Sequence, residues 1–310
     1  MKTWGAHIAL LALVAVAGLM VGDYHQGNLS RIMVLAVYAT GYNILFGYTG
    51  LLSLGHAMFF AAGLYAAGLG IRFLDFGAIP AFIAGLAAGA VLAGILGALA
   101  LRAKGVAFMI VTLMFAQAVY LTILYFGEYT RGDEGFVLQP DERLFFGTPL
   151  SNPDLRFWVA FALFAAATLI TLAIVRRPLG KTLVAIRENE ARAQMLGYDT
   201  FRLKWTAVVL SGTFSAASGA AYGLLFGYVG ASFASVQYSI FPLLWVLLGG
   251  AGTVLGPFIG TLFMFYLIDF SSGLTTAYML IAGVALVLLT LFAPQGIAGE
   301  VRRRVLKGLP

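Results

Sequence analysis

The stretch Gly47–Gly63, "GYTGLLSLGHAMFFAAG", carries four glycines inside a long apolar region. No Asp, Glu, Lys or Arg occurs between Ile32 and Ile71, so the stretch is too apolar for a surface loop. Each glycine nevertheless costs a helix up to about 1 kcal/mol relative to alanine. We therefore expect a helix that is interrupted within an apolar environment.

Composition places the whole chain in a membrane. The 310 residues are 61% hydrophobic and 10% charged, whereas soluble domains carry about 25% charged residues. Further charge-free runs cover 76–101, 105–127, 157–175, 205–268 and 270–299. Because a spanning helix needs about 20 apolar residues, we expect an all-α polytopic membrane protein. It should have about ten transmembrane helices, some broken or half-length, in a single domain over residues 1–310.

We expect helices near 7–22, 31–47, 56–71, 77–101, 105–127, 156–175, 205–228 and 274–293. The residues after Lys2 could form a signal peptide, but the first of many spans is the plainer interpretation. Region 238–270 is ambiguous. An odd number of crossings over 238–293 is needed to bring both termini to one side, and three crossings, the first of them short, satisfy this.

The net charge of +6 is unevenly distributed. Fourteen of the 19 Lys and Arg residues lie at Lys2, 102–104, 176–204 and 302–307. By the positive-inside rule these segments face the cytoplasm. The acidic loop 128–155 should face outward. This pattern favours a membrane topology over nucleic-acid binding.

Two glycine-rich interruptions resemble one another. Thr49-Gly50 leads to Leu54-Gly55, and Ala251-Gly252 leads to Leu255-Gly256. Paired interruptions in two halves of a transporter indicate broken helices around a substrate pathway, although small residues also serve close helix packing. The predicted pathway residues are Thr49, Gly50, Ser53, Gly55, His56, Gly249, Gly250, Gly252 and Thr253.

The segment 176–204 is the one substantial basic interruption. Pro178 and Gly180 should break the preceding helix, and the apolar pattern from Lys181 predicts an amphipathic helix ending at Gly197. Such a helix could lie on the membrane surface or dock another protein. Gly180-Lys181-Thr182 looks like the end of a phosphate-binding loop, but the required glycine five positions earlier and the preceding strand are missing.

Other chemistry is poorly supported. There is no cysteine, and no metal-ligand spacing links His7, His25 and His56. His56 could donate a hydrogen bond along the pathway, or it could cap the helix after Gly55. Proton-driven transporters commonly carry an ionisable residue at membrane depth, and only His56 qualifies. We therefore expect no enzyme activity, no metal and no cofactor, with energy supplied from outside this chain.

Four motifs resemble the LivM-type permeases of branched-chain amino-acid ABC importers. They are "YNILFGYTGLLSLGHAMFFAAGLYAAG", "AIRENEARAQMLGYDTFRLKWTAVVLSGTFSAASGAAYGLL", "LLGGAGTVLGPFIGTLF" and "LFAPQGIAG". They occur in the family's order between Arg31 and Gly299. The resemblance implies an ABC importer permease fold in a bacterial inner membrane, with both termini cytoplasmic.

The resemblance also implies partners. These are a homologous, LivH-like second permease, two cytoplasmic ATPases that use ATP and Mg²⁺, and a periplasmic substrate-binding protein. Glu190-Ala191 with Gly197 matches the loop that ABC permeases insert into the ATPase, although Arg192 stands where many carry Ala. The predicted coupling residues are Lys181, Arg187, Glu190, Ala191, Arg192 and Gly197. The substrate stays open among branched-chain or other amino acids, urea, amides and aromatic acids. A self-contained secondary transporter is the rival class.

Overall fold

The computed structural model describes residues 2–293 and 295–304. The long helices are α1 (Lys2–Met20), α2 (Asp23–Asn43), α3 (Ala57–Leu74), α4 (Ala78–Ala100), α5 (Val106–Tyr125), α7 (Pro153–Arg176) and α10 (Thr200–Phe226). Shorter helices are α6 (Gly127–Thr130), α8 (Pro178–Glu188), α9 (Glu190–Met195), α11 (Val236–Gly249), α12 (Gly256–Ser272), α13 (Tyr278–Phe292) and α14 (Gly296–Arg304). The π-helical turn η1 (Ile44–Tyr48) and the 3-10 turns η2 (Pro140–Glu142) and η3 (Ala231–Ala234) complete the helical elements.

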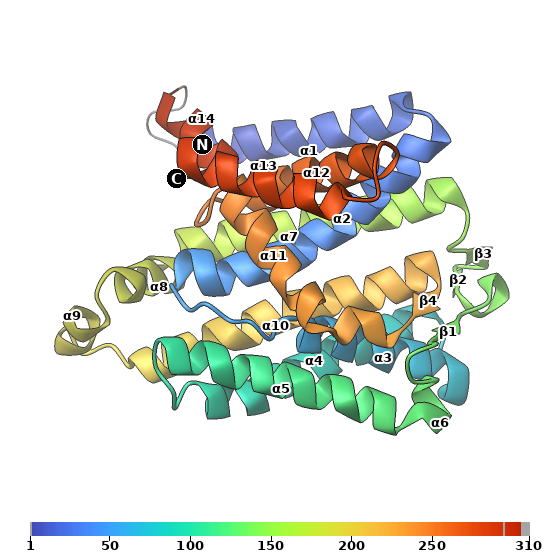
Figure 1. The fold of residues 1–310 in the computed structure, drawn as a ribbon, viewed down its shortest axis with the longest axis horizontal. Helices are drawn as coiled ribbons and strands as arrows, with labels where there is room; N and C mark the ends of the chain where they lie inside the picture. Colours follow the sequence, from blue (N-terminus) through green and yellow to red (C-terminus); the bar gives the residue numbers. More distant parts are fainter. Residues whose placement is uncertain (1, 294, 305–310) are drawn as a thin grey trace.

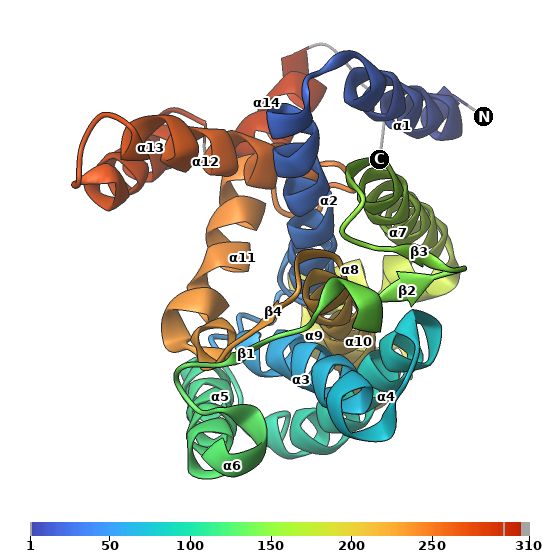
Figure 2. The same cartoon turned by 90° about the vertical axis from the view of Figure 1, so that its right-hand side faces the viewer.

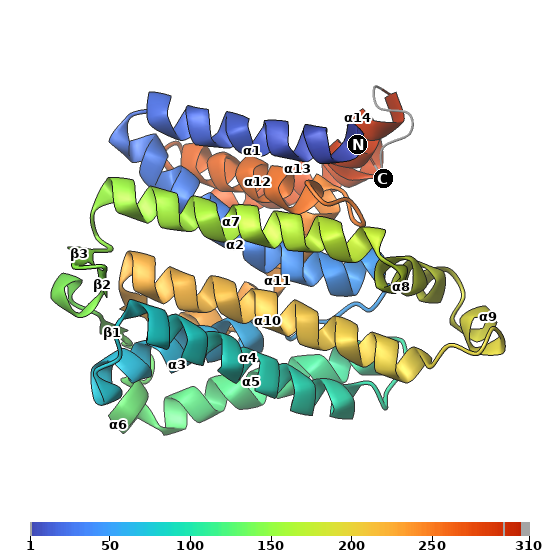
Figure 3. The ribbon, with the colours of Figure 1, turned by 180° about the vertical axis from the view of Figure 1, so that it is seen from behind.

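The long helices lie side by side as a bundle, with α8 and α9 protruding from one end (Figures 1 and 3). We call this the α9 end. The opposite, hairpin end carries the antiparallel pair β2 (Leu144–Phe145) and β3 (Thr148–Pro149). It also carries β1 (Phe136–Val137) paired with β4 (Tyr228–Val229). The start of α1 and helix α14 both lie at the α9 end (Figure 1).

Helix lengths and hydropathy agree with a membrane bundle. Six helices of the described chain are long and apolar enough to span a bilayer, and His7–Met20 and α11 are shorter apolar helices. The ambiguous region 238–293 contains α11, α12 and α13, with α11 the shortest. Three helices, the first of them short, stand where three crossings are expected, and that each of them crosses the membrane stays a prediction. The expected start of α2 is wrong, because the helix already begins at Asp23.

The core forms where α2, α3, α4 and α10 pack closely. A Cβ on Gly63 would lie 2.1 Å from the Ala216 carbonyl oxygen, and one on Gly219 would lie 2.0 Å from that of Phe60. Glycines therefore let the backbones of α3 and α10 touch, as small residues do between membrane helices. Large apolar side chains point outward instead, as Ile83 and Val91 of α4 and Met114 of α5 do. That outer surface suits lipid.

Candidate site at the two helix breaks

The first break follows α2. The chain passes through the π-helical turn η1, where the hydroxyl of Thr49 donates to the carbonyl of Ile44 at 2.9 Å. It then runs without regular structure until α3 begins. The Tyr42 hydroxyl donates to the Ser53 carbonyl at 3.0 Å, so α2 satisfies a backbone group that a continuous helix would have satisfied itself. The helix expected to reach residue 47 is α-helical to Asn43 and continues as the π-helical turn to Tyr48.

The second break separates α11 from α12. Gly250 and Gly252 adopt φ of 116° and 75°, which side chains rarely allow. The hydroxyl of Thr253 donates to the Gly250 carbonyl at 2.7 Å and accepts from the Gly256 amide at 3.1 Å. These contacts form a tight turn between two membrane helices. Positive φ explains why glycine stands at both positions.

The two breaks meet at one place. The Asn43 side chain donates to the Thr253 carbonyl at 2.8 Å and accepts from the Gly252 amide at 2.9 Å. Arg187 of α8 donates through Nη1 to the Gly47 carbonyl. We call Asn43, Gly47, Arg187, Gly252 and Thr253 the junction. It joins both halves of the chain to the segment that protrudes at the α9 end.

The predicted pathway residues fall into two environments. Gly55 and Gly249 are buried against backbone, since added Cβ atoms would lie 2.0 Å from the Thr112 oxygen and 1.8 Å from the Gly256 oxygen. Close packing explains these two. Thr49 and Gly50 instead help line an open cavity of about 490 Å³, together with Arg187 and Glu190. Gly250 and Ser53 are buried, whereas Gly252 and Thr253 are half-buried.

His56 does not act as the predicted helix cap. It occupies the position before α3, but its side chain makes no capping hydrogen bond. Its ring is fully buried, with Nε2 2.6 Å from the Ser211 hydroxyl, and that hydroxyl donates to the Gly41 carbonyl at 2.5 Å. His56 therefore ties the first break to α10. The capping hypothesis fails because the ring finds a partner across the bundle.

The coupling segment is two helices, where the sequence predicted one over 181–197. The predicted break lies directly before Pro178, because α7 ends at Arg176 and Arg177 is extended. Pro178 then begins α8, since its fixed φ suits a first helical position, and Gly180 lies within α8. Asn189, with φ of −159°, ends α8 and starts α9. The Asn189 side chain accepts from the Arg192 amide at 2.9 Å, which is an N-cap contact. The apolar pattern does not reveal this cap, although the asparagine of "ENEAR" is a typical N-cap residue.

Glu190 has partners within the chain. Its carboxylate accepts from Lys204 Nζ at 2.6 Å and from the Thr200 hydroxyl at 3.1 Å. Burial raises the pKa of Glu190, but these hydrogen bonds and the Lys204 charge outweigh it and hold the pKa below its ordinary value. Lys204 is itself buried. Glu190 thus fastens α9 to the start of α10, so its carboxylate is already paired.

The surface of α9 is open. Lys181, Ala191, Arg192 and Gly197 are exposed, and nothing lies within 4 Å of a Cβ added at Gly197. Beside them, Met195 and Leu196 expose 84% and 72% of their surface. We call Met195, Leu196 and Tyr198 the α9 tip. Helix α9, which leads into this tip, protrudes from the bundle (Figure 3).

Aromatic side chains connect the hairpin end to the first break. Successive ring centroids lie 4.8 to 5.9 Å apart from Phe226 through Tyr222, Phe233, Tyr238 and Tyr38. The ring of His56, which also meets that of Tyr42, lies 6.5 Å from that of Tyr38. We call the rings from Phe226 to Tyr38 the aromatic column. They come from α2, α10, η3 and α11. Sequence reasoning missed these residues, because their spacing in sequence carries no common pattern.

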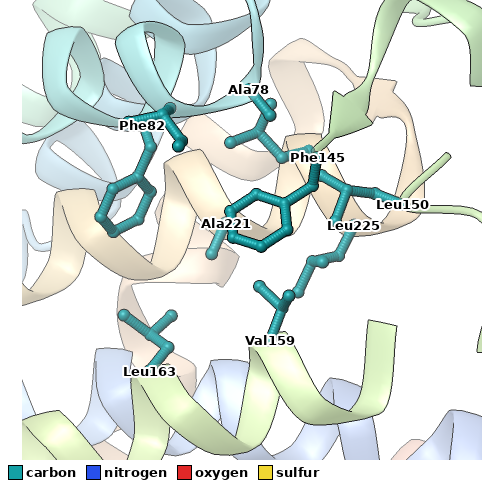
Figure 4. Close-up of a pocket in the computed structure, with 10 residues that line it drawn as sticks. Ala78, Phe82, Phe145, Leu150, Val159, Leu163, Ala221 and Leu225 are labelled. Atoms are coloured by element: carbon teal, nitrogen blue, oxygen red, sulfur yellow. The ribbon is translucent and has the colours of Figure 1, made fainter. Parts of the chain in front are cut away.

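A separate groove lies between α4, α7 and α10. It has a volume of about 240 Å³ and is lined by apolar residues, including Phe82, Val159 and Leu225. Phe145 of the hairpin points into it (Figure 4). Its hydrocarbon lining offers no partner for the charged groups of an amino acid. Among the described residues no cluster of His, Cys, Asp or Glu could hold a metal ion.

The fold and the broken helices define a multi-pass membrane permease. Residues 26–293 match the family described as "Branched-chain amino acid transport system / permease component". The chain belongs to this family, whose members are the non-catalytic permease components of ABC transporters.

Relatives agree with this assignment. The chain is 28% identical to the high-affinity branched-chain amino acid permease LivM of Escherichia coli, over 95% of this chain and 75% of that protein. It is 26% identical to the ribose import permease RbsC of Haemophilus influenzae, over 92% of this chain and 91% of that protein. A solved structure described as a metal-chelate type ABC transporter in an inward-facing conformation aligns with a TM-score of 0.51 at 18% identity. That alignment covers 94% of this chain and 98% of the other, and shows the fold.

Proposed function

We propose that this chain forms, with a homologous second permease, the inward path for branched-chain or other amino acids, which a periplasmic binding protein delivers. Two ATPases dock at the α9 end, which is cytoplasmic, and the hairpin end faces the binding protein. The family membership supports the transporter class. The LivM relative supports amino acids, while the ribose name of RbsC indicates that this scaffold alone does not choose the cargo.

The junction is the observation that carries the coupling proposal. Arg187, on the helix directly before α9, holds the Gly47 carbonyl, and a Cβ on Gly252 would lie 3.1 Å from the Arg187 guanidinium. A force on α8 and α9 would therefore reach both helix breaks. ATPase movement at the α9 tip could reshape the membrane-embedded turns through a single side chain.

The docking role is favoured over a membrane-surface role. Lipid-binding helices are usually basic and carry a broad apolar face. Here α8 and α9 mix Lys181, Arg187 and Arg192 with Glu188 and Glu190, and α9 stands off from the bundle. The small apolar α9 tip is typical of a protein contact with a polar rim.

Reconstituted complexes test the proposal. The measurements are uptake and ATP hydrolysis, with and without substrate-loaded binding protein. We expect uptake to require the ATPases. Uptake of amino acid by vesicles that hold this permease pair without ATPases would identify a self-contained secondary transporter instead.

A further inference from the structure

Two arginines converge on one ring at the hairpin end. The guanidinium carbon of Arg31 lies 5.3 Å from the centroid of Phe226, and that of Arg156 lies 5.7 Å from it. They come from α2 and α7, while Phe226 ends α10. Three helices that are distant in sequence thus bring two like charges to one aromatic side chain.

Neither guanidinium has a countercharge within the described chain. No carboxylate lies within 4.0 Å of Arg31 or Arg156, whereas two other ion pairs do form. The Nε atom of Arg156 is buried with no hydrogen-bond partner. Asp154 lies nearby but contacts Gln26 at 3.4 Å. The buried Nε of Arg156 is costly without an acceptor. An anion would supply that acceptor and a countercharge for both Arg156 and the exposed Arg31 beside it.

A third arginine strengthens the local positive potential. Arg143 is buried and donates to the carbonyls of Leu224 at 2.9 Å and Gln139 at 3.3 Å. The neighbouring Glu142 carboxylate caps its own turn by accepting from the Gln139 amide at 2.7 Å. Arg143 therefore has fixed donors and acts by charge, while Arg31 and Arg156 keep donors for a ligand.

We propose that Arg31 and Arg156 form a carboxylate-binding site at the mouth of the permease, which receives a carboxylate-bearing solute before it passes along the aromatic column. The ring of Phe226 is the first in that column. Guanidinium groups bind carboxylates with strong, directional hydrogen bonds, and the rings beyond them suit an apolar or aromatic side chain. This inference rests on the proposed import function and narrows its cargo, because urea and neutral amides lack the anion.

The test measures binding to the isolated full-length permease in uncharged detergent micelles. The probes are acetate and L-leucine, with acetamide and urea as neutral matches, and saturation-transfer NMR is the readout. We expect acetate and leucine to bind and the neutral probes not to bind. Arg31→Gln with Arg156→Gln should weaken acetate binding about tenfold or more. Arg131→Gln, at the same end but outside the pair, should leave it unchanged.

Two further measurements distinguish loss of the site from misfolding and from occupation by lipid. Arg31→Lys with Arg156→Lys preserves both charges, and retained acetate binding there shows that loss in the Gln pair is not misfolding. Equal acetate binding by wild type and the Gln pair overturns the proposal. So does a site held by lipid, seen when phosphatidylglycerol in nanodiscs abolishes acetate binding by wild type. Because no ATPase is present, failure here leaves the permease assignment intact, and failure of ATP-driven uptake leaves this binding result intact.

Discussion

Asn43 is the residue on which the two helix breaks depend. Its side chain is fully buried and uses its oxygen and nitrogen on the Gly252 amide and the Thr253 carbonyl. Both groups belong to a turn that has no helical partners for them. A side-chain amide supplies one donor and one acceptor without placing a charge in the membrane.

Asn43→Ala should destabilise the protein. It leaves a half-buried backbone amide and carbonyl without partners, and the cost of each stays below the roughly 1–3 kcal/mol of a fully buried group. The measurement is the thermal unfolding midpoint of purified protein in detergent. Asn28→Ala is the matched control, because Asn28 is also buried on α2 but its Nδ2 has no partner. Equal shifts for the two variants would contradict a bridging role for Asn43.

Arg187→Ala should uncouple the transporter. Loss of the contact to Gly47 disconnects α8 from the first break while the α9 tip remains available to the ATPases. We expect substrate uptake to fall about tenfold or more while ATP hydrolysis continues, since a charge-assisted hydrogen bond is lost. Thr182→Ala serves as control, because Thr182 lies on the same helix but outside the junction and the predicted coupling residues. Normal uptake per ATP in the Arg187 variant would rule out the mechanical link.

Among the elements, α9 differs most from the rest of the chain. It has only six residues and is held by the Asn189 cap and the Glu190 to Lys204 ion pair. These anchors keep its outer face free. An element this short would be unstable alone, so its shape depends on contacts with α8 and α10.

The α9 tip should be needed for ATPase docking. Met195→Asp with Leu196→Asp places charges on the exposed apolar contact, so the ATPases should no longer copurify with the permease pair. The fold should be unaffected because both side chains face solvent. Phe146→Asp is the control, since Phe146 is 85% exposed at the hairpin end. Retained ATPase binding by the double variant would place the docking surface elsewhere.

Residues 190–197 also hold α9 to α10, and the double variant Glu190→Lys with Gly197→Leu tests this role separately. The first change sets like charges beside Lys204, and the second puts a side chain at φ of 86°. We expect stimulated ATP hydrolysis and uptake to fall together in reconstituted vesicles. Arg202→Gln, which removes only an exposed ion pair, should change little. Intact stimulation in the double variant would exclude 190–197 from coupling.

At the scale of the whole molecule, opposite ends carry different chemistry. The α9 end gathers α8, α9, α14 and the start of α1, and the hairpin end gathers the 128–155 loop (Figures 1 and 2). As far as the structure describes them, the basic segments and the acidic loop predicted by charge therefore fall on opposite ends. The positive-inside rule predicts that the α9 end faces the cytoplasm.

Single cysteines should report this orientation directly, because the chain contains none. Arg192→Cys and Asp141→Cys are suitable, since both residues are exposed at opposite ends. We expect an impermeant maleimide added to intact cells to label Asp141→Cys and not Arg192→Cys. Gly180, buried against Val175, is unsuitable, and Lys307 lies outside the described residues. The reverse labelling pattern would invert the proposed topology.

The class, most helix positions and the existence of two breaks could be predicted from the amino-acid sequence, whereas the start of α2 and the division of 181–197 could not be placed by the apolar pattern. Those features depend on local quantities: charge-free length sets the spans, and glycine at 50 and 252 permits positive φ. The coupling segment was also visible, because basic residues interrupt apolar ones. The division of this segment into two helices could also have been predicted, because Asn189 is a residue type that commonly caps the start of a helix.

Which distant residues meet follows from the three-dimensional packing of the helices and not from local sequence. Asn43 and Thr253 are 210 positions apart, and Arg187 reaches Gly47 across 140. Arg31, Arg156 and Phe226 likewise form a group only because α2, α7 and α10 pack together at one end. No local pattern encodes such pairs, since close packing of the glycine-lined helices fixes the register between them.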